Sequence, residues 1–163
     1  MKRRPIHTRR LLAVLLAASL LTGALSGCLF KPPAIESRDG TVDYGDVADA
    51  VTTAVPRVVG VEDLSRSLNG FAYRISLRLE VDSAEPLTAE ELDAVVEAIW
   101  RAVPWEPNTI KIVAGADTAE GHEVVDLRAA AEDLEDLGVT NAGTGGVSLT
   151  GMDARYGAWT APE

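Results

Sequence analysis

The sequence predicts an α+β domain in which helices pack on one face of a small, mainly antiparallel sheet, in the order α-β-β-α-β-α. The alternation of apolar and polar residues over Phe71–Val81 is typical of a strand with one buried face. The stretch that follows, up to Pro104, repeats apolar residues at the helical spacing. A chain of 163 residues has room for one such two-layer domain with tails.

The first helix is expected over about Tyr44–Val55. Asp43 is placed to accept backbone N–H bonds as its N-cap, and Pro56 ends the run. A hairpin follows, and its Asn69-Gly70 dipeptide favours a type I′ turn because both residues tolerate positive φ.

The strands of this hairpin are expected over Arg57–Leu68 and Phe71–Val81. From Val59 onward, the apolar residues of the first strand lie at odd positions in its first half and at even positions in its second half, so they would point to opposite faces. We therefore expect a β-bulge near Glu62 and Asp63, which would return the apolar residues to one face.

The second helix begins at Thr88. Thr88 and Glu91 have the spacing of a capping box, while Leu87 and Leu92 can form a hydrophobic staple. The helix should pack on the apolar face of the second strand through one stripe: Leu92, Val95, Val96, Ile99 and Val103.

A short strand is expected over Thr109–Ala114, with Ile110 and Ile112 facing inward, followed by a polar loop to His122. Asp126 would then cap a third helix that Gly138 stops. The inner stripe of that helix would be Leu127, Ala130, Ala131, Leu134 and Leu137.

The first 27 residues differ from the rest in charge and hydropathy. They hold five of the fifteen basic residues and no acidic one, and residues 11–25 are almost entirely Leu, Ala and Val. A basic region followed by an apolar run is the pattern of an export signal. At ~1.5 Å per residue the run is too short to cross a hydrocarbon core of ~30 Å.

Leu25, Ser26, Gly27 and Cys28 directly follow the apolar run. This segment resembles the lipobox of bacterial lipoproteins, which implies cleavage between Gly27 and Cys28 and acylation of the Cys28 sulfur. Lipid on Cys28 would hold the protein on the extracytoplasmic face of the cell membrane. Cys28 is the only cysteine, which excludes an intramolecular disulfide. The alternative is a soluble secreted protein in which Cys28 has no role.

The expected organisation is therefore a signal peptide over 1–27, an acylated cysteine and tether over 28–40, and a globular domain over 41–138. A Gly-rich tail over 139–163 would follow, in which only Gly146–Gly151 could add an edge strand. Without the signal peptide, ten basic residues stand against 25 acidic ones. Such a surface repels phosphate backbones, so nucleic-acid binding is not expected.

No pattern of residues indicates catalysis. His122 is the only histidine after the signal peptide, and no serine lies in a Gly-x-Ser-x-Gly elbow, so we expect no enzyme and assign no catalytic residue. Asp117, Glu120 and Glu123 surround His122, but the spacing matches neither an EF-hand nor a His-Glu-x-x-His helix. No metal site and no other cofactor is predicted.

Four side chains are the candidates for binding a partner: Trp105, Trp159, Arg74 and Arg78. The tryptophans lie in a loop and in the tail, where aromatic side chains can anchor a protein; alternatively, the tail folds back and buries Trp159. The arginines share the polar face of one strand and could form a cationic stripe; alternatively, they pair with Glu62 and Glu80.

Over residues 43–114 the predicted order, with Val59-Gly60-Val61 entering the hairpin, resembles the alkaline-shock protein family of Gram-positive bacteria and the BON envelope module. The resemblance implies an envelope-associated domain and provides no catalytic residue. We therefore expect a membrane-anchored lipoprotein whose domain binds or scaffolds an envelope protein. Two alternatives stay open, a carrier of a small apolar ligand held between sheet and helices, and a hydrolase using His122.

Overall fold

The computed structural model describes residues 42–163. The expected signal peptide, the Gly27–Cys28 cleavage and lipidation site and the tether lie outside the described residues. The helices are α1 (Val47–Ala54), α2 (Ala89–Ala102), α3 (Arg128–Glu132) and α4 (Met152–Tyr156). The strands are β1 (Val58–Asn69), β2 (Ala72–Val81), β3 (Pro107–Thr118), β4 (Gly121–Val125), β5 (Gly138–Gly143) and β6 (Gly146–Thr150).

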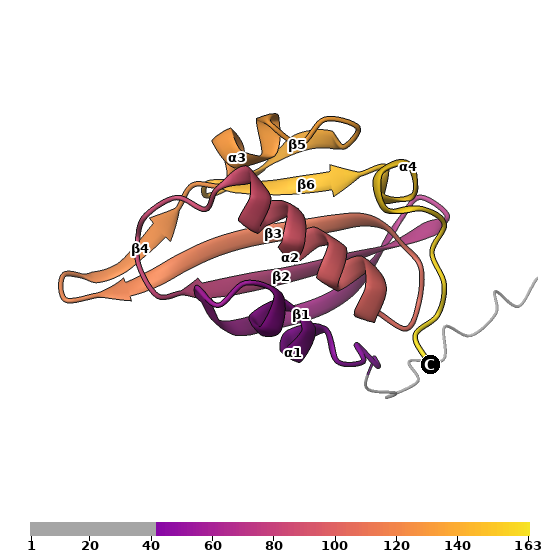
Figure 1. Cartoon of the computed structure of the whole chain (residues 1–163), viewed down its shortest axis with the longest axis horizontal. Helices are drawn as coiled ribbons and strands as arrows, with labels where there is room; N and C mark the ends of the chain where they lie inside the picture. Colours follow the sequence, from indigo (N-terminus) through magenta and orange to yellow (C-terminus); the bar gives the residue numbers. More distant parts are fainter. Residues whose placement is uncertain (1–41) are drawn as a thin grey trace, which may run out of the picture. The chain divides into compact units, whose positions relative to one another are not determined.

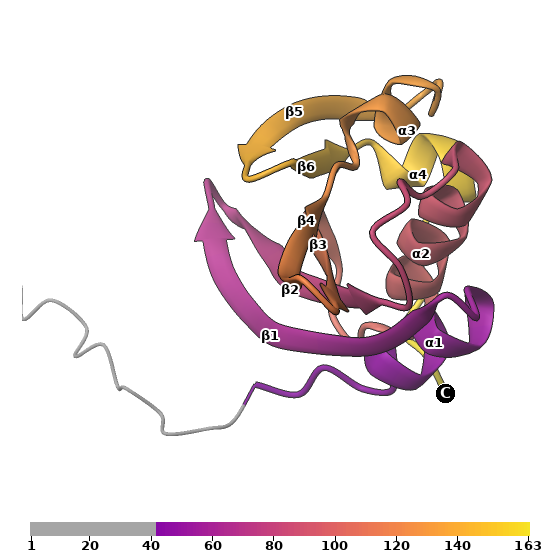
Figure 2. The ribbon, with the colours of Figure 1, turned by 90° about the vertical axis from the view of Figure 1, so that its left-hand side faces the viewer.

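The described residues form one six-stranded sheet with the order β1-β2-β3-β6-β5, and β4 pairs with β3 off this path. Helices cover a single face of it (Figures 1 and 2). Only β2 and β3 are parallel, because α2 carries the chain back across the sheet between them. The predicted α+β class and mainly antiparallel sheet are confirmed, although the full order is α-β-β-α-β-β-α-β-β-α.

The best-predicted element is α2. The Thr88 hydroxyl accepts from the Glu91 backbone N–H at 3.1 Å, and the Glu91 carboxylate accepts from the Thr88 N–H at 2.8 Å, so the capping box is confirmed. Leu87 and the whole predicted stripe are buried in the core between helix and sheet. Alternate residues of β2 from Ile75 to Val81 form the opposite side of that core.

The β1–β2 hairpin contains the predicted bulge. The register shifts between Glu62 and Ser65, and Asp63 there has a φ of +53°. The predicted turn is wrong by one residue, because Asn69 pairs with Ala72 and leaves Gly70 and Phe71 as the loop. Only Gly70 has positive φ, as a type II′ turn requires, and Phe71 is fully exposed instead of facing the core. A second register shift, between Val58 and Gly60, leaves Val59 exposed as well.

Two predicted helices are shorter than expected. The helix α1 begins at Val47, because the Asp43 carboxylate accepts from the Gly45 N–H and forms a turn before the helix instead of capping it. The helix α3 ends at Glu132, although its predicted inner stripe is buried. The acidic run that follows would lie at the negative end of the helix dipole, which disfavours continuing it.

The segment after Ala114 differs most from expectation. The polar loop predicted up to His122 is instead a β-hairpin, in which β3 continues to Thr118 and pairs with β4. The predicted tail is also part of the sheet, since β5 and β6 form a hairpin. The strand foreseen over Gly146–Gly151 exists as β6, but it lies between β3 and β5, so it is internal and β5 is at the edge.

Candidate functional site

The face of the sheet turned away from the helices is not covered by any other element of residues 42–163, and it carries polar side chains. We call it the open face. In Figure 2, β1 and β5 both bend away from the helices, so the open face is concave. Ser65 of β1 is exposed, and the other central side chains are half-buried: Arg74, Ser76, Arg78, Lys111 and Ser148.

Strand register places hydroxyl groups and a lysine in one row across the open face. Ser65 of β1 lies opposite Ser76 of β2, which lies opposite Lys111 of β3. Lys111 in turn lies opposite Ser148 of β6, and Ser148 lies opposite Thr140 of β5. Five strands thus contribute hydrogen-bonding side chains to one line, because period-2 alternation points paired residues to the same side.

The open face is hollowed beside this row. A smaller hollow of about 210 Å³ is lined mainly by Asp63, Ser65, Ser76, Arg78, Lys111 and Val113. A larger hollow of about 330 Å³ adjoins it and is lined by Arg78, Val113, Ala114, His122, Val124 and Thr144. Arg78 and Val113 line both, so the two hollows lie side by side.

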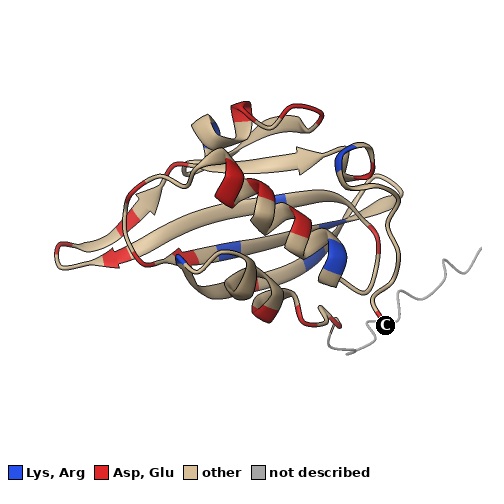
Figure 3. Cartoon of the chain, in the orientation of Figure 1, with Lys and Arg blue, Asp and Glu red and all other residues tan. Residues whose placement is uncertain are grey.

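Most cations on the open face form no ion pair within the described residues. The other cations of the described chain that form ion pairs do so away from this face: Arg57, Arg101, Arg128 and Arg155. On the open face only Arg78 has an acidic partner, with its Nε 3.4 Å from the Asp63 carboxylate, and within residues 42–163 neither Arg74 nor Lys111 forms an ion pair. Figure 3 shows basic residues on the central strands and acidic residues along α2, in the β3–β4 hairpin and in turns. The strands β1 and β2 also hold acidic residues: Glu62, Asp63 and Glu80.

The predicted pairing of Arg74 and Arg78 with Glu62 and Glu80 is wrong. Neither glutamate forms an ion pair within the described part of the chain. The Nε atoms of both arginines are buried and have no hydrogen-bond partner there. Buried donors without acceptors are uncommon and unfavourable. The Arg74 guanidinium group is therefore available to an acceptor from outside the domain, whereas Arg78 would have to exchange its Asp63 partner for one.

A second polar group lies at the β3–β4 end of the open face. His122 Nδ1 is 3.0 Å from Asp117 Oδ1, and the Asp117 backbone N–H donates to the Glu80 carboxylate at 3.0 Å. The imidazole lies over Gly115, where a Cβ would be 2.5 Å from Nε2. Of the group around His122 in the sequence, only Asp117 contacts the histidine. Glu80 could not be foreseen, because strand register brings it in from β2.

Ligand atoms of Glu80, Asp117 and His122 lie within 4.8 Å of one another. Two carboxylates and an imidazole can bind a divalent cation such as Zn²⁺. The Asp117 side chain is 81% exposed, however, and none of the three residues is buried. Binding would therefore have to order mobile side chains, which favours weak association. The absence of a dedicated metal site stays a prediction.

The two candidate tryptophans contact their own domain. Trp105 donates from Nε1 to the Asp43 carbonyl at 2.9 Å, and its ring packs edge-on against Tyr44 and Tyr73. The Arg66 guanidinium lies 5.4 Å from the centre of the same indole. Trp159 packs against the core, so the alternative in which the tail folds back is confirmed. Both side chains are half-buried, which leaves only part of each ring for a partner.

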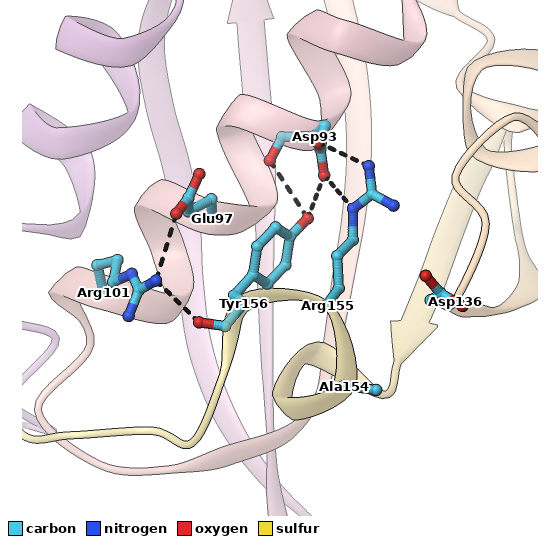
Figure 4. A pocket seen from close by; sticks show the side chains of 7 residues that line it. All are labelled: Asp93, Glu97, Arg101, Asp136, Ala154, Arg155 and Tyr156. Atoms are coloured by element: carbon cyan, nitrogen blue, oxygen red, sulfur yellow. Dashed lines mark hydrogen bonds and ion pairs between the residues drawn. The ribbon is translucent and has the colours of Figure 1, made fainter.

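The C-terminal segment is fastened to α2 by a cluster that the sequence did not indicate. Arg155 donates to both carboxylate oxygens of Asp93, at 2.7 and 2.8 Å, and the Tyr156 hydroxyl donates to the same carboxylate (Figure 4). Arg101 donates to the Tyr156 carbonyl at 2.8 Å. The adjoining cavity of about 420 Å³ is lined by these residues with Glu97, Asp136 and Ala154.

The pKa values of Asp93 and Tyr156, two groups of this cluster, are shifted in opposite directions. The Arg155 hydrogen bonds hold the pKa of the Asp93 carboxyl below its usual range, although partial burial acts the other way. Burial raises the pKa of the Tyr156 hydroxyl, and the hydrogen bond to Asp93 and its negative charge raise it further. The charged carboxylate and the neutral phenol are therefore both favoured near neutral pH, which suits a structural contact.

Comparison of the chain with protein-family models, curated proteins and solved structures finds no match. The resemblance of residues 43–114 to the alkaline-shock and BON domains therefore stays a prediction. The function has to be inferred from the geometry of this domain and from its amino-terminal sequence.

Proposed function

We propose that this protein is a lipid-anchored, extracytoplasmic binding protein that holds another component of the cell envelope on the open face of its sheet. The proposal rests on the shape, the polarity and the charge of that face. The face is concave, polar and mostly half-buried, and it carries cations that form no ion pair within the described residues, in a domain whose acidic residues far outnumber its basic ones.

The two arginine Nε atoms without a hydrogen-bond partner favour a binding surface over a simple solvated one. An unsatisfied buried donor destabilises a domain by about 1–3 kcal/mol. On the open face the buried Nε atoms belong to two arginines on one strand, and both adjoin a row of hydroxyls. A partner that supplies acceptors would offset this loss, so the arrangement favours the bound state of the domain.

The two other functions considered have less support. A hydrolase using His122 would need a nucleophile, and within residues 42–163 the only side chain that hydrogen-bonds His122 is Asp117. A carrier of an apolar molecule would need space between sheet and helices, where a single cluster of buried side chains packs. The proposed binding role would need neither catalysis nor a cofactor.

Lipid on Cys28 would provide the attachment to the membrane. In the described part of the chain no helix has both the length and the hydropathy needed to span a bilayer. The dozen or so residues after Cys28 can extend at ~3.3 Å each. The tether would hold the domain up to roughly 40 Å from the membrane surface, among the components of the envelope.

Replacing Cys28 by alanine is expected to move the protein from the membrane fraction to the soluble extracytoplasmic fraction and to abolish incorporation of radiolabelled palmitate. Each acyl methylene contributes about 0.8 kcal/mol of membrane affinity, so loss of the whole lipid should be nearly complete in effect. Ser26→Ala, which keeps a small residue at that position, should remain labelled and membrane-bound. A Cys28→Ala protein that stays in the membrane fraction would contradict the anchor.

Binding on the open face can be checked by site-specific photo-crosslinking in native membranes. A photoreactive residue at Ser148, within the open face, should capture one defined component. The same residue at Glu90, exposed on α2, should not. Capture at Ser148 should decrease in an Arg78→Gln background and persist with Arg101→Gln, which removes an exposed cation on the helix side. Equal capture at both positions would refute a role for the open face.

A further inference from the structure

We infer that the smaller hollow of the open face binds the phosphate group of a soluble phosphate ester. This inference rests on the proposed binding function and adds a small ligand at the same open face. The hollow, of about 210 Å³, is smaller than the ~300–1,000 Å³ typical of sites that enclose a whole small molecule. It therefore fits one functional group of a ligand, with the remainder extending into the larger hollow.

The donors in and beside this hollow match a phosphate. Lys111 and Arg78 provide two positive charges, and the Ser65 and Ser76 hydroxyls lie opposite each other at the same level of the sheet. A phosphate monoester carries a charge of about −1.5 to −2 near neutral pH and presents three acceptor oxygens. Arg74 lies two residues before Ser76 in β2, so both side chains are on the same face. The buried Nε of Arg74 has no hydrogen-bond partner in residues 42–163.

Asp63 is the one acidic side chain on this hollow, and it provides a sharp test. Its carboxylate is 3.4 Å from Arg78 Nε and is largely exposed on the bulge of β1. An incoming phosphate would replace this carboxylate as the partner of Arg78. Asp63 is therefore a competitor of the ligand, and removing its charge should strengthen binding. Asparagine tolerates positive φ as aspartate does, so Asp63→Asn should preserve the bulge.

The charge distribution favours a compact soluble ester over a membrane surface. The Debye length at physiological ionic strength is about 8 Å, so a single phosphate in the hollow senses mainly the cations Lys111 and Arg78 and the one carboxylate of Asp63. An anionic bilayer would also face Glu80 of β2 and the acidic β3–β4 hairpin that borders the open face, including Asp117 and the exposed Glu123. A phosphate ester avoids that repulsion.

The test uses the full, lipidated chain in dodecyl maltoside micelles, labelled with ¹⁵N-lysine and titrated with glycerol 1-phosphate. The Lys111 amide should shift saturably, while Lys31, in the expected tether, serves as an internal control. Arg78→Gln should weaken binding about tenfold or more, because charge-assisted bonds are lost. Asp63→Asn should strengthen it about threefold. Arg101→Gln should leave the dissociation constant unchanged.

The inference is overturned if Lys111 does not shift, if the Arg78 and Asp63 variants titrate like the Arg101 control, or if acetate binds as tightly as glycerol 1-phosphate. Binding to phosphatidylglycerol vesicles without binding to the soluble ester would overturn it in favour of a lipid surface. If Lys111 does not respond but the Ser148 photo-crosslink persists, the phosphate inference fails while the proposed binding function stands. Loss of both results would refute both.

Discussion

Gly146→Ala is expected to lower the free energy of unfolding by about 2–4 kcal/mol, a large effect for one methyl group. Gly146 begins β6, the strand that joins the β5–β6 hairpin to β3. A Cβ there would lie 2.6 Å from the Ile112 carbonyl oxygen and 2.6 Å from Val113 Cγ1. The carbonyl belongs to a paired strand, so the clash can be relieved only by separating β6 from β3.

Gly60→Ala is the matched control, because Gly60 is also a strand glycine. A Cβ at Gly60 would meet only the Glu80 side chain, at 3.5 Å, which is an ordinary contact. Its expected effect is within about 0.5 kcal/mol of zero. Urea unfolding followed by tryptophan fluorescence compares the two variants, since Trp100 is buried in the core. Equal stabilities of the two variants would show that β6 is not held against β3 as described.

The elements that could be predicted from the sequence are those with local signals. Period-2 alternation predicts the buried face of β2, and the Thr88 capping box predicts the start of α2. Both signals depend on residues that are only a few positions apart. The end of α3 and the β3–β4 hairpin were mispredicted. Ala114, Gly115 and Ala116 are too small to produce a clear strand pattern, although all three are buried in β3.

The candidate site could be predicted only in part, because strand pairing brings some of its residues together. Alternation identified Arg74 and Arg78 as neighbours on a polar face. Lys111 joins them only through the parallel pairing of β2 with β3, and Asp63 only through the geometry of the bulge. Strand order and register depend on how the whole chain packs. No spacing within the sequence could have shown which acid faces Arg78.

Asp93→Asn is expected to destabilise the domain by about 2 kcal/mol at pH 7. The change leaves the Arg155 guanidinium without its anion, in a pair whose side chains are only 30% and 25% exposed. Loss of the contact should also loosen α4 and the following residues, including the Gly157 carbonyl that accepts from Trp100. Glu97→Gln removes an exposed partner of Arg101 on the same helix and should change stability by about 0.5 kcal/mol or less.

The pH dependence of the stability difference between wild type and Asp93→Asn identifies the cause of that difference. The pKa of Asp93 is lower in the folded than in the unfolded protein, so its contribution is fully present above the ordinary value of 3.8. It is lost as the pH falls through the lowered folded value. The gap between wild type and Asp93→Asn in urea unfolding should therefore be constant from pH 7 to about 5 and shrink below about 4. A gap that stays unchanged down to pH 2 would mean that the variant is weakened by altered packing and not by loss of the ion pair.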